Sequence, residues 1–231
     1  MEMIGQKTYQ MIDREARIQA ARGRMPRAEL RDEETGALIF RGYVVEPMPE
    51  RQRVYFMGAH STGKSTLAQW VSNQYGLPLI PEVARRLLRE CKTTLNEVRM
   101  NPDQSDVFQL YVFQKQLEAE AKYRSFVSDR GCDHLAYAVE HARVAGEIYE
   151  DKRFTDYMAS LRADGVSVFL VRPHRELLVD DGVRAGVDWD SVQRIDAMTQ
   201  MLLQISGVQY IEIASKSMCE RTALIEQVLE G

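Results

Sequence analysis

Five short runs rich in apolar and β-forming residues predict strands. They are residues 53–57, 77–80, 126–128, 166–171 and 208–213. The run 166–171, Val-Ser-Val-Phe-Leu-Val, is strongly apolar and β-branched, as expected of a central parallel strand. Segments with a helical spacing of apolar residues separate the runs. Because strands and helices alternate, the sequence predicts an α/β domain in which right-handed crossovers wind a parallel sheet with helices on both faces.

The longest expected helix begins at Asn101-Pro102 and continues to about residue 123. Asn is a favoured N-cap, and Pro suits the first helical turn. We expect its buried stripe to consist of Val107, Leu110, Tyr111, Leu117 and Ala121. Capping-box patterns at residues 94–97 and 217–220 predict two further helix starts.

Residues 1–52 precede the first strand of this alternating pattern. We therefore predict an N-terminal extension over residues 1–52, with a helix at residues 8–21 and a strand at 37–46, followed by a core domain over residues 53–231. Between positions 14 and 31 of the extension, six arginines stand against two glutamates, an excess of four positive charges. This arginine cluster is either a solvated helix face or a basic arm that contacts a phosphate-bearing partner.

Residues 58–66, Gly-Ala-His-Ser-Thr-Gly-Lys-Ser-Thr, match G-x-x-x-x-G-K-[ST], the pattern of a phosphate-binding P-loop. The motif lies between an expected strand and an expected helix. Its glycines allow a close backbone approach, and the loop N–H groups and helix N-terminus attract an anion. Lys64 would reach the β- and γ-phosphates of a nucleotide, and the Ser65 hydroxyl would ligate Mg²⁺. The predicted phosphate-binding residues are Gly58, His60, Ser61, Thr62, Gly63, Lys64, Ser65 and Thr66.

The composition is that of an ordinary globular protein. Of the 231 residues 45% are hydrophobic and 28% are charged, and the formal net charge of −4 gives no overall attraction to nucleic acid. Three cysteines lie far apart without a C-x-x-C pair, and no long apolar run or signal peptide is present. These features predict a cytoplasmic protein, or one in the host cytoplasm if phage-encoded, with buried thiols and no membrane segment.

Polar residues follow the second and third expected strands, at the edge where an open α/β sheet binds its ligands. Glu82 and Arg85 follow the second strand, and Asp129 follows the third. Asp129 is placed for Mg²⁺ or for an acceptor hydroxyl, the alternative being a helix cap. It is not followed by the Glu of a hydrolytic motor ATPase, and no Asn-Lys-x-Asp guanine signature occurs. On the long helix, Gln109 and Gln114 either bind a base edge or are half-exposed helix positions.

The order of these motifs resembles the P-loop nucleoside and nucleotide kinases, and in particular the ATPase/kinase family that includes the nicotinamide riboside kinase domain of bacterial NAD regulators. The resemblance covers about residues 53–229 and includes the P-loop, a Glu-x-x-Arg, a Ser-Asp-Arg block at residues 128–130 and an arginine-bearing lid at about 173–194. It implies a P-loop NTPase fold with a five-stranded sheet of order 2-3-1-4-5. Together with the glutamines, it gives these candidate substrate-binding residues: Glu82, Arg85, Gln109, Gln114, Arg130, Asp133, Tyr137 and Arg194.

The resemblance further implies ATP and Mg²⁺ as the phosphoryl donor and its metal ion. Phosphoryl transfer depends on positioning and charge neutralisation, so we assign Lys64 to the phosphates and Ser65 with Asp129 to Mg²⁺. Asp129 would also orient the acceptor hydroxyl or take its proton, and Glu82 is the competing base. Arg184 and Arg194 would close over the transferring phosphoryl group and exclude water.

Three functions remain open at this point. The first is a kinase for a free nucleoside or nucleotide hydroxyl. The second is a kinase for a modified nucleotide within DNA, as in some phage members of this broad group that phosphorylate 5-hydroxymethyluracil. The third is an ATP-binding switch that acts through a protein partner. The lid arginines and the missing Asp-Glu pair disfavour the third. The basic arm favours the second, and the net charge opposes it.

Overall fold

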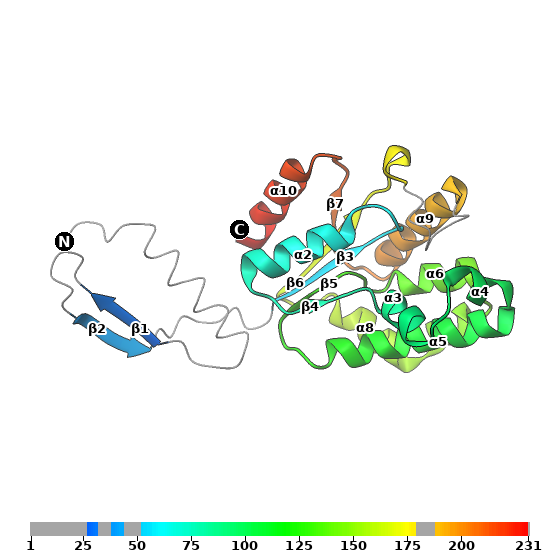
Figure 1. Cartoon of the computed structure of the whole chain (residues 1–231), viewed down its shortest axis with the longest axis horizontal. Helices are drawn as coiled ribbons and strands as arrows, with labels where there is room; N and C mark the ends of the chain where they lie inside the picture. Colours follow the sequence, from blue (N-terminus) through cyan, green and yellow to red (C-terminus); the bar gives the residue numbers. More distant parts are fainter. Residues whose placement is uncertain (1–26, 32–37, 44–51, 179–187, 231) are drawn as a thin grey trace.

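The structure, a computed structural model, describes residues 27–31, 38–43, 52–178 and 188–230, with side chains from residue 52 onward. A five-stranded sheet forms its centre (Figure 1). The strands are β3 (Arg53–Met57), β4 (Leu79–Ile80), β5 (Phe126–Ser128), β6 (Val166–Val171) and β7 (Ile211–Ile213). All neighbours in the sheet are parallel, in the order β4-β5-β3-β6-β7. Counted along the chain this order is 2-3-1-4-5, which confirms the predicted topology.

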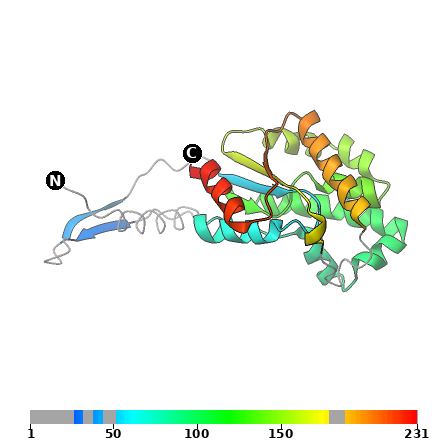
Figure 2. The same ribbon diagram turned by 90° about the horizontal axis from the view of Figure 1, so that it is seen from above.

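Helices cover both faces of the sheet, as Figures 1 and 2 show. One face packs against α2 (Lys64–Tyr75) and α10 (Met218–Glu230). The opposite face packs against α5 (Pro102–Glu120), α6 (His134–His141), α7 (Ala145–Glu150), α8 (Lys152–Ser160) and α9 (Trp189–Ile205). Helix α3 (Val83–Glu90) follows β4, and helix α4 (Leu95–Met100) lies between α3 and α5. The 3₁₀ turn η1 (Arg175–Leu177) follows β6.

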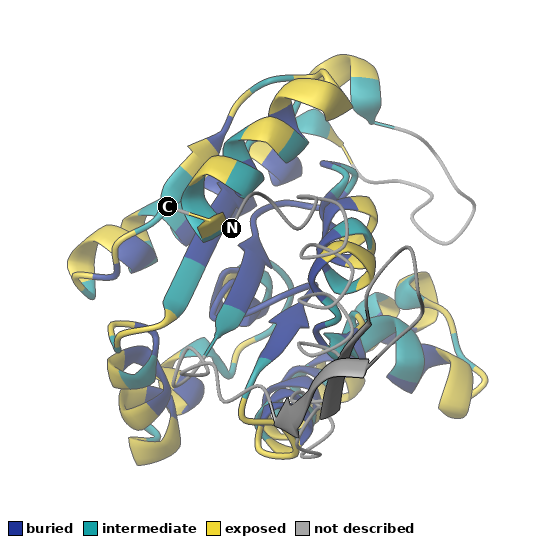
Figure 3. Cartoon of the chain, turned by 90° about the vertical axis from the view of Figure 1, so that its left-hand side faces the viewer, coloured by how far each residue is buried: buried dark blue, intermediate teal, exposed yellow. Residues whose placement is uncertain are grey.

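Strand β3 divides the hydrophobic core into its two layers. Tyr55 and Met57 point into the cluster beneath α5, α6 and α8, whereas Val54 and Phe56 point into the cluster beneath α2. This alternation follows from the two-residue period of a strand, and all four side chains are fully buried. Phe56 stacks on Phe169 of β6, with ring centroids 5.3 Å apart. Figure 3 shows the strands buried between helices whose outer sides are exposed.

Helix α5 begins as predicted, because Asn101 caps it by accepting from the N–H groups of Asp103 and Gln104. The expected buried stripe is wrong in part, since Val107, Tyr111 and Ala121 are exposed. The face that α5 buries is partly polar, and it consists of Ser105, Gln109, Val112, Phe113, Gln116, Ala119 and Glu120. A carboxylate and two amides are therefore buried on this face, so the hydrophobic pattern alone selected the wrong side of the helix.

The polar part of that face is hydrogen-bonded to its surroundings. Glu120 accepts from the hydroxyls of Tyr55, at 2.6 Å, and Tyr157, at 2.9 Å. Gln116 donates to Glu120 at 2.7 Å and to Ser128 at 3.0 Å. Such bonds offset most of the cost of burying polar groups. The network ties α5 to β3, β5 and α8.

Residues of the predicted extension form an antiparallel pair of strands, β1 (Arg27–Arg31) and β2 (Leu38–Tyr43), with Leu30 opposite Phe40. Strand β2 lies within the predicted strand 37–46, whereas β1 was not expected, because its charged sequence has little β propensity of its own. The predicted helix 8–21 lies outside the described residues, and the domain boundary at residue 52 stays a prediction. Among the described residues, no helix is long and apolar enough to cross a membrane. Of the cysteines, Cys132 is buried as expected, but Cys91 and Cys219 are exposed.

Candidate active site

The P-loop connects the end of β3 to the start of α2 in the conformation that its glycines allow. Gly58 has a φ of 127°, and a Cβ there would lie 2.7 Å from the carbonyl oxygen of Val171. Gly63 has a φ of 90°, and a Cβ there would lie 2.9 Å from Nη1 of Arg221. Ser61 also takes a positive φ, of 58°. Both motif glycines are thus required by the backbone of the loop, which curls into the anion-binding form that the sequence predicts.

A pocket opens above this loop, at the place predicted to hold phosphate, and is called the phosphate pocket below. It is lined by Ser61, Thr62, Gly63, Lys64, Ser65, Thr66, Glu82, Arg85, Asp129, Arg130 and Leu177. The Lys64 ammonium group donates to the carbonyl oxygen of Ala59 and, at 3.1 Å, to Oγ1 of Thr62. Burial lowers the pKa of Lys64 to about 7, and the nearby Arg130 cation adds to the effect. A bound phosphate would relieve this by supplying a negative charge.

Asp129 and Ser65 form the second feature of this pocket. Asp129 follows β5 and is buried, and it lines the pocket together with Ser65. Burial raises the pKa of Asp129, whereas the nearby cations of Arg130 and Lys64 act to lower that pKa. It makes no ion pair within 4 Å in the described part of the chain, and it does not cap a helix. A buried carboxylate beside a hydroxyl fits a hard cation such as Mg²⁺, which takes few protein ligands and completes its shell with phosphate and water.

The Arg130 side chain, which follows β5, connects the P-loop to the residues after β4 and β5. It is buried, and its Nη1 donates to the carbonyl oxygen of Gly58 at 2.9 Å, to Asp133 Oδ2 at 3.0 Å and to the Tyr137 hydroxyl at 2.9 Å. Its Nη2 donates to Glu82 Oε1 at 3.0 Å. The guanidinium also lies over the Tyr137 ring, 4.6 Å from its centroid. Three residues predicted as substrate contacts, Glu82, Asp133 and Tyr137, are thereby brought together around a fourth, Arg130.

Glu82 has a further partner in Arg85, whose Nε lies 2.7 Å from Glu82 Oε2. Both residues line the phosphate pocket, just beyond the second strand of the sheet. Asp133 is fully buried and also accepts from the backbone N–H of Gly131 at 2.7 Å. Asp133 therefore supports Arg130 and the turn after β5, and it lines neither of the two pockets described.

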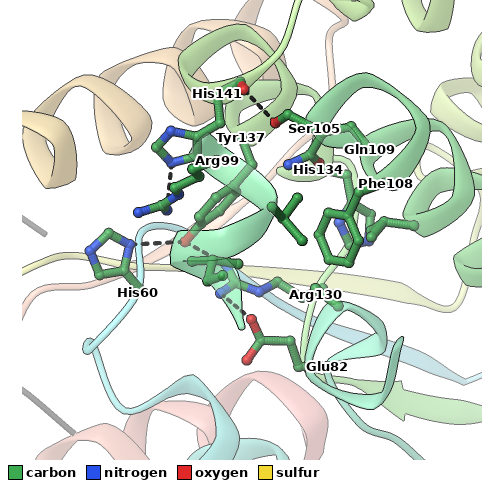
Figure 4. Close-up of a pocket in the computed structure, with 14 residues that line it drawn as sticks. His60, Glu82, Arg99, Ser105, Phe108, Gln109, Arg130, His134, Tyr137 and His141 are labelled. Atoms are coloured by element: carbon green, nitrogen blue, oxygen red, sulfur yellow. Dashed lines mark hydrogen bonds and ion pairs between the residues drawn. The ribbon is translucent and has the colours of Figure 1, made fainter. Parts of the chain in front are cut away.

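A second pocket lies beside the first and encloses about 640 Å³, including the space open to solvent. Its apolar wall comes from Leu95, Val98, Phe108 and Val112, and its polar lining includes His60, Glu82, Arg99, Gln109, Arg130, His134, Tyr137 and His141. Figure 4 shows these side chains converging from the P-loop, from α4 and α5, and from α6. The mixed apolar and polar lining is that of a site for a small molecule. Glu82 and Arg130 line both pockets, so the two spaces meet at this pair.

Three histidines face this second pocket. His60 belongs to the P-loop, but its ring points toward Tyr137, with Nδ1 3.4 Å from the hydroxyl, and it does not line the phosphate pocket. Burial lowers the pKa of both His134 and His141 to about 4, so both are neutral at pH 7. Both line the second pocket, because α6 turns them toward α4 and α5.

The remaining predicted residues fall into three groups: one lines the second pocket, two lie away from both pockets, and one lies outside the described residues. Gln109 lines the second pocket and is buried, and its amide makes no hydrogen bond with other described residues. Gln114 is exposed on the outer side of α5, where it donates to Glu118 at 2.9 Å. Arg194 of α9 lines neither pocket and forms a two-pronged ion pair with Glu140, with distances of 2.7 and 3.0 Å. Arg184 and the middle of the expected lid lie outside the described residues, although Leu177 before them reaches the phosphate pocket.

Two arginines at the site were missed by the sequence interpretation. Arg221 of α10 is buried and donates to the carbonyl oxygens of Thr62, at 2.7 Å, and Ser215, at 2.5 Å. Its position in the first turn of a helix was a usable signal, because a cation there is opposed by the helix dipole. Arg99 of α4 lines the second pocket. Nothing in its local sequence distinguishes it from a solvent-exposed arginine.

Comparison with known proteins identifies the family and the fold. The family model described as AAA domain (AAA_28) matches residues 53–221. A search of curated proteins found no significant match.

Several solved structures share the fold at low sequence identity. They include NadR in complex with NR (18% identity, TM-score 0.59, 73% of this chain and 47% of that one). Deoxyadenosine kinase from M. mycoides, with the products dCMP and dCDP bound, is 13% identical (TM-score 0.55, 78% and 99%). Shikimate kinase from Acinetobacter baumannii, in complex with shikimate, is 12% identical (TM-score 0.51, 79% and 95%). This chain thus spans about half the length of NadR.

The family model covers the whole span from β3 to the start of α10, and the sheet order, the P-loop and the neighbouring structures agree with it. This chain belongs to the AAA-domain family, with the P-loop NTPase fold shared by nucleoside and nucleotide kinases.

Proposed function

We propose that this protein transfers the γ-phosphoryl group of ATP to a hydroxyl group of a small nucleoside- or nucleotide-type acceptor. The observation that carries the proposal is the junction of the two pockets at Glu82 and Arg130. A phosphate held by the P-loop and an acceptor held in the second pocket would meet there. A switch that only binds and hydrolyses ATP has no need of a second, side-chain-lined pocket at this position.

On the donor side, Lys64 and the N–H groups of the loop would hold the β- and γ-phosphates of ATP. Lys64 would exchange its contact with the Ala59 carbonyl for phosphate oxygens. The Ser65 hydroxyl and the Asp129 carboxylate are the candidate protein ligands of Mg²⁺. When bound, Mg²⁺ would neutralise charge on the phosphate oxygens.

On the acceptor side, Glu82 is the better candidate for the base, because it lines both pockets whereas Asp129 lines only the phosphate pocket. In the proposed step, the acceptor oxygen attacks the γ-phosphorus and the bond to the bridging β,γ-oxygen breaks. ADP leaves with that electron pair, and the hydroxyl proton passes to the Glu82 carboxylate. Arg130 holds that carboxylate in place and keeps a positive charge beside the reacting atoms.

The rest of the second pocket suits a nucleoside. Phe108 and the aliphatic side chains offer an apolar surface to a base, and the unengaged Gln109 amide can donate to and accept from a base edge. Two of the neighbouring structures hold NR or dCMP, which supports this class of acceptor. Shikimate kinase has the same fold with a different acceptor, so the fold alone does not identify the class of acceptor.

The test is an acceptor screen with γ-labelled ATP and Mg²⁺, offering nucleosides, nucleoside monophosphates and shikimate. We expect label in one nucleoside-type product, with none formed by Lys64→Ala. Release of labelled phosphate at the same rate with and without every acceptor, and no labelled product, would overturn the proposal in favour of an ATPase switch.

The arginine excess between positions 14 and 31 supports a second candidate, a kinase for a modified base in DNA. The same screen should include plain and 5-hydroxymethylated single-stranded DNA at two salt concentrations. If DNA is the acceptor, changing Arg22, Arg24 and Arg27 to Ala should weaken DNA phosphorylation several-fold at low salt and less at high salt, while ATP binding is kept. If DNA stays unlabelled while a free nucleoside is phosphorylated equally by the intact and changed proteins, this candidate is wrong.

A further inference from the structure

Arg99 is the least neutralised cation in the second pocket. Its Nε is buried and has no hydrogen-bond partner. Its Nη2 lies 2.8 Å from Nε2 of His141, and an arginine can only donate, so His141 accepts with an uncharged ring. In the described part of the chain, no carboxylate lies within ion-pair distance of Arg99. Burial lowers the pKa of Arg99, which reflects the cost of placing this charge away from water.

Neighbouring arginines show how this chain treats other shielded cations. Arg130 is paired with Glu82 and Asp133. Arg172 is paired with Asp196 at 2.8 Å. Glu140 is near Arg99, but its carboxylate is engaged by Arg194. Arg99 therefore lines the cavity without the carboxylate partners that Arg130 and Arg172 have, and its charge costs free energy unless a ligand supplies the anion.

We infer that Arg99 binds a negatively charged group of the acceptor, and that the pocket is built for a nucleoside monophosphate rather than for an uncharged nucleoside. This inference rests on the proposed function, because it concerns the acceptor of the same reaction. The phosphate of the acceptor would occupy the Arg99 side of the pocket, beside His141. Its hydroxyl would occupy the junction at Glu82, where Arg130 is already ion-paired and offers less attraction to a second anion.

The surroundings of Arg99 fit this division. Figure 4 shows its guanidinium beside the His141 ring, while the Tyr137 hydroxyl reaches toward His60 and Arg130. The rings of Tyr137 and His141 lie 6.3 Å apart, so the aromatic pair stands between the two arginines in the hydrogen-bond network. Arginine is well suited to a phosphate, because its planar donors can bind two oxygens at once.

The experiment compares the four common 2′-deoxynucleosides with their 5′-monophosphates. Binding to the full-length protein is measured by calorimetry with a non-hydrolysable ATP analogue present, and transfer is measured with labelled ATP. We expect at least one monophosphate to bind and react about 10- to 100-fold better than its nucleoside, which is the range for a hydrogen-bonded charge pair. Arg99→Gln should lower the binding and reaction of the monophosphate by that factor and so remove its preference over the nucleoside, and Arg99→Lys should keep part of it.

Arg89→Gln is the matched control, since Arg89 is exposed on α3 and lines neither pocket. Thermal melting of each variant shows whether the loss of the His141 contact affects the fold. The inference is overturned if nucleosides bind as well as monophosphates, if none of these compounds binds, or if Arg99→Gln lowers both classes equally.

A further arm offers a short single-stranded DNA that contains 5-hydroxymethyluracil. If only this DNA shows dependence on Arg99, the anion is a phosphodiester and the mononucleotide is the wrong acceptor. The binding arm does not require turnover, so Arg99-dependent binding of a monophosphate without transfer would refute the proposed kinase reaction and keep the anion site.

Discussion

Arg130 Nη2 lies 3.0 Å from Glu82 Oε1, and this buried pair connects the residue after β5 to the residue before α3. It stands where the phosphate pocket and the second pocket meet. The carboxylate is held from one side by Arg130 and from the other by Arg85, at 2.7 Å. Its orientation toward an acceptor is therefore fixed before any ligand binds.

Removing the charge of Glu82 should affect a different kinetic quantity from removing the charge of Asp129. Glu82→Gln should lower kcat by about 10²-fold or more at saturating Mg²⁺, as expected for loss of a positioned base. Asp129→Asn should instead raise the Mg²⁺ concentration needed for half-maximal rate, because Asp129 and Ser65, the candidate protein ligands of Mg²⁺, line the phosphate pocket together. Steady-state rates over a Mg²⁺ titration measure both. If Glu82→Gln leaves kcat unchanged and no Mg²⁺ concentration restores the rate of Asp129→Asn, then Asp129 is the base and Glu82 is not.

Lys64→Ala should reduce phosphoryl transfer by at least about 10²-fold and leave the fold intact, because the ammonium group is held by the loop itself and supports no apolar core. Labelled-ATP transfer and far-UV circular dichroism measure the two effects. Lys64→Arg is the control that keeps the charge. Near-normal turnover of a folded Lys64→Ala protein would show that the loop does not bind the reacting phosphates.

Arg221→Met should weaken ATP binding about tenfold without removing a ligand contact. Arg221 fixes the carbonyl of Thr62, and its loss leaves that buried oxygen without its donor at a cost of about 1–3 kcal/mol. The KM for ATP should rise more than kcat falls, since Arg221 positions the loop and does not touch the acceptor. Arg221→Lys should recover part of the affinity. A purely structural role would instead lower the melting temperature and leave the KM of the folded fraction unchanged.

His134 makes the stability of the protein depend on pH in the acid range. Burial lowers the pKa of His134 from 6.5 to about 4, so between these values the unfolded chain binds a proton that the folded chain does not. Stability from this group is therefore complete above pH 6.5 and is lost as the pH falls toward 4, by at most about 3 kcal/mol. His134→Phe should flatten the rise in unfolding free energy from pH 4.5 to 6.5, measured by urea denaturation. An unchanged slope would show that His134 titrates normally in the folded protein.

Arg184 and Arg194 were both assigned to the lid, but we expect their substitution by Ala to have different effects on kcat. Arg184→Ala should lower kcat more than it weakens ATP binding, because a lid arginine meets charge that develops at transfer. Arg194→Ala should change kcat less than about threefold, since Arg194 is exposed and paired with Glu140 away from both pockets. Pre-steady-state transfer and equilibrium ATP binding separate the effects. A large loss of kcat in Arg194→Ala would mean that the helix leaves Glu140 during turnover.

The sequence by itself determined the parts of this protein whose function depends on adjacent residues. The P-loop is a local structure, so its glycines, Lys64 and Ser65 were identifiable from their spacing, and the alternation of strands and helices predicted the parallel sheet. Glu82 and Asp129 were also identifiable, because the ends of parallel strands meet at one edge of the sheet.

The tertiary structure decided everything that depends on which faces pack together. Glu120 and Gln116 are buried on α5 because they bond to Tyr55, Tyr157 and Ser128 from other elements, and no local pattern reveals those partners. Arg194 was assigned to the lid, yet Glu140, far away in sequence, binds it.

Arg99 and Arg221 show the same limit within the site. The local sequence of Arg99 gives no signal, and that of Arg221 gives only its place in the first turn of a helix. Folding alone brings one to the second pocket and the other to the carbonyl of Thr62. The physical reason is that a side chain's charge environment is set by residues distant in sequence, whereas the turn of a P-loop is set by residues next to one another.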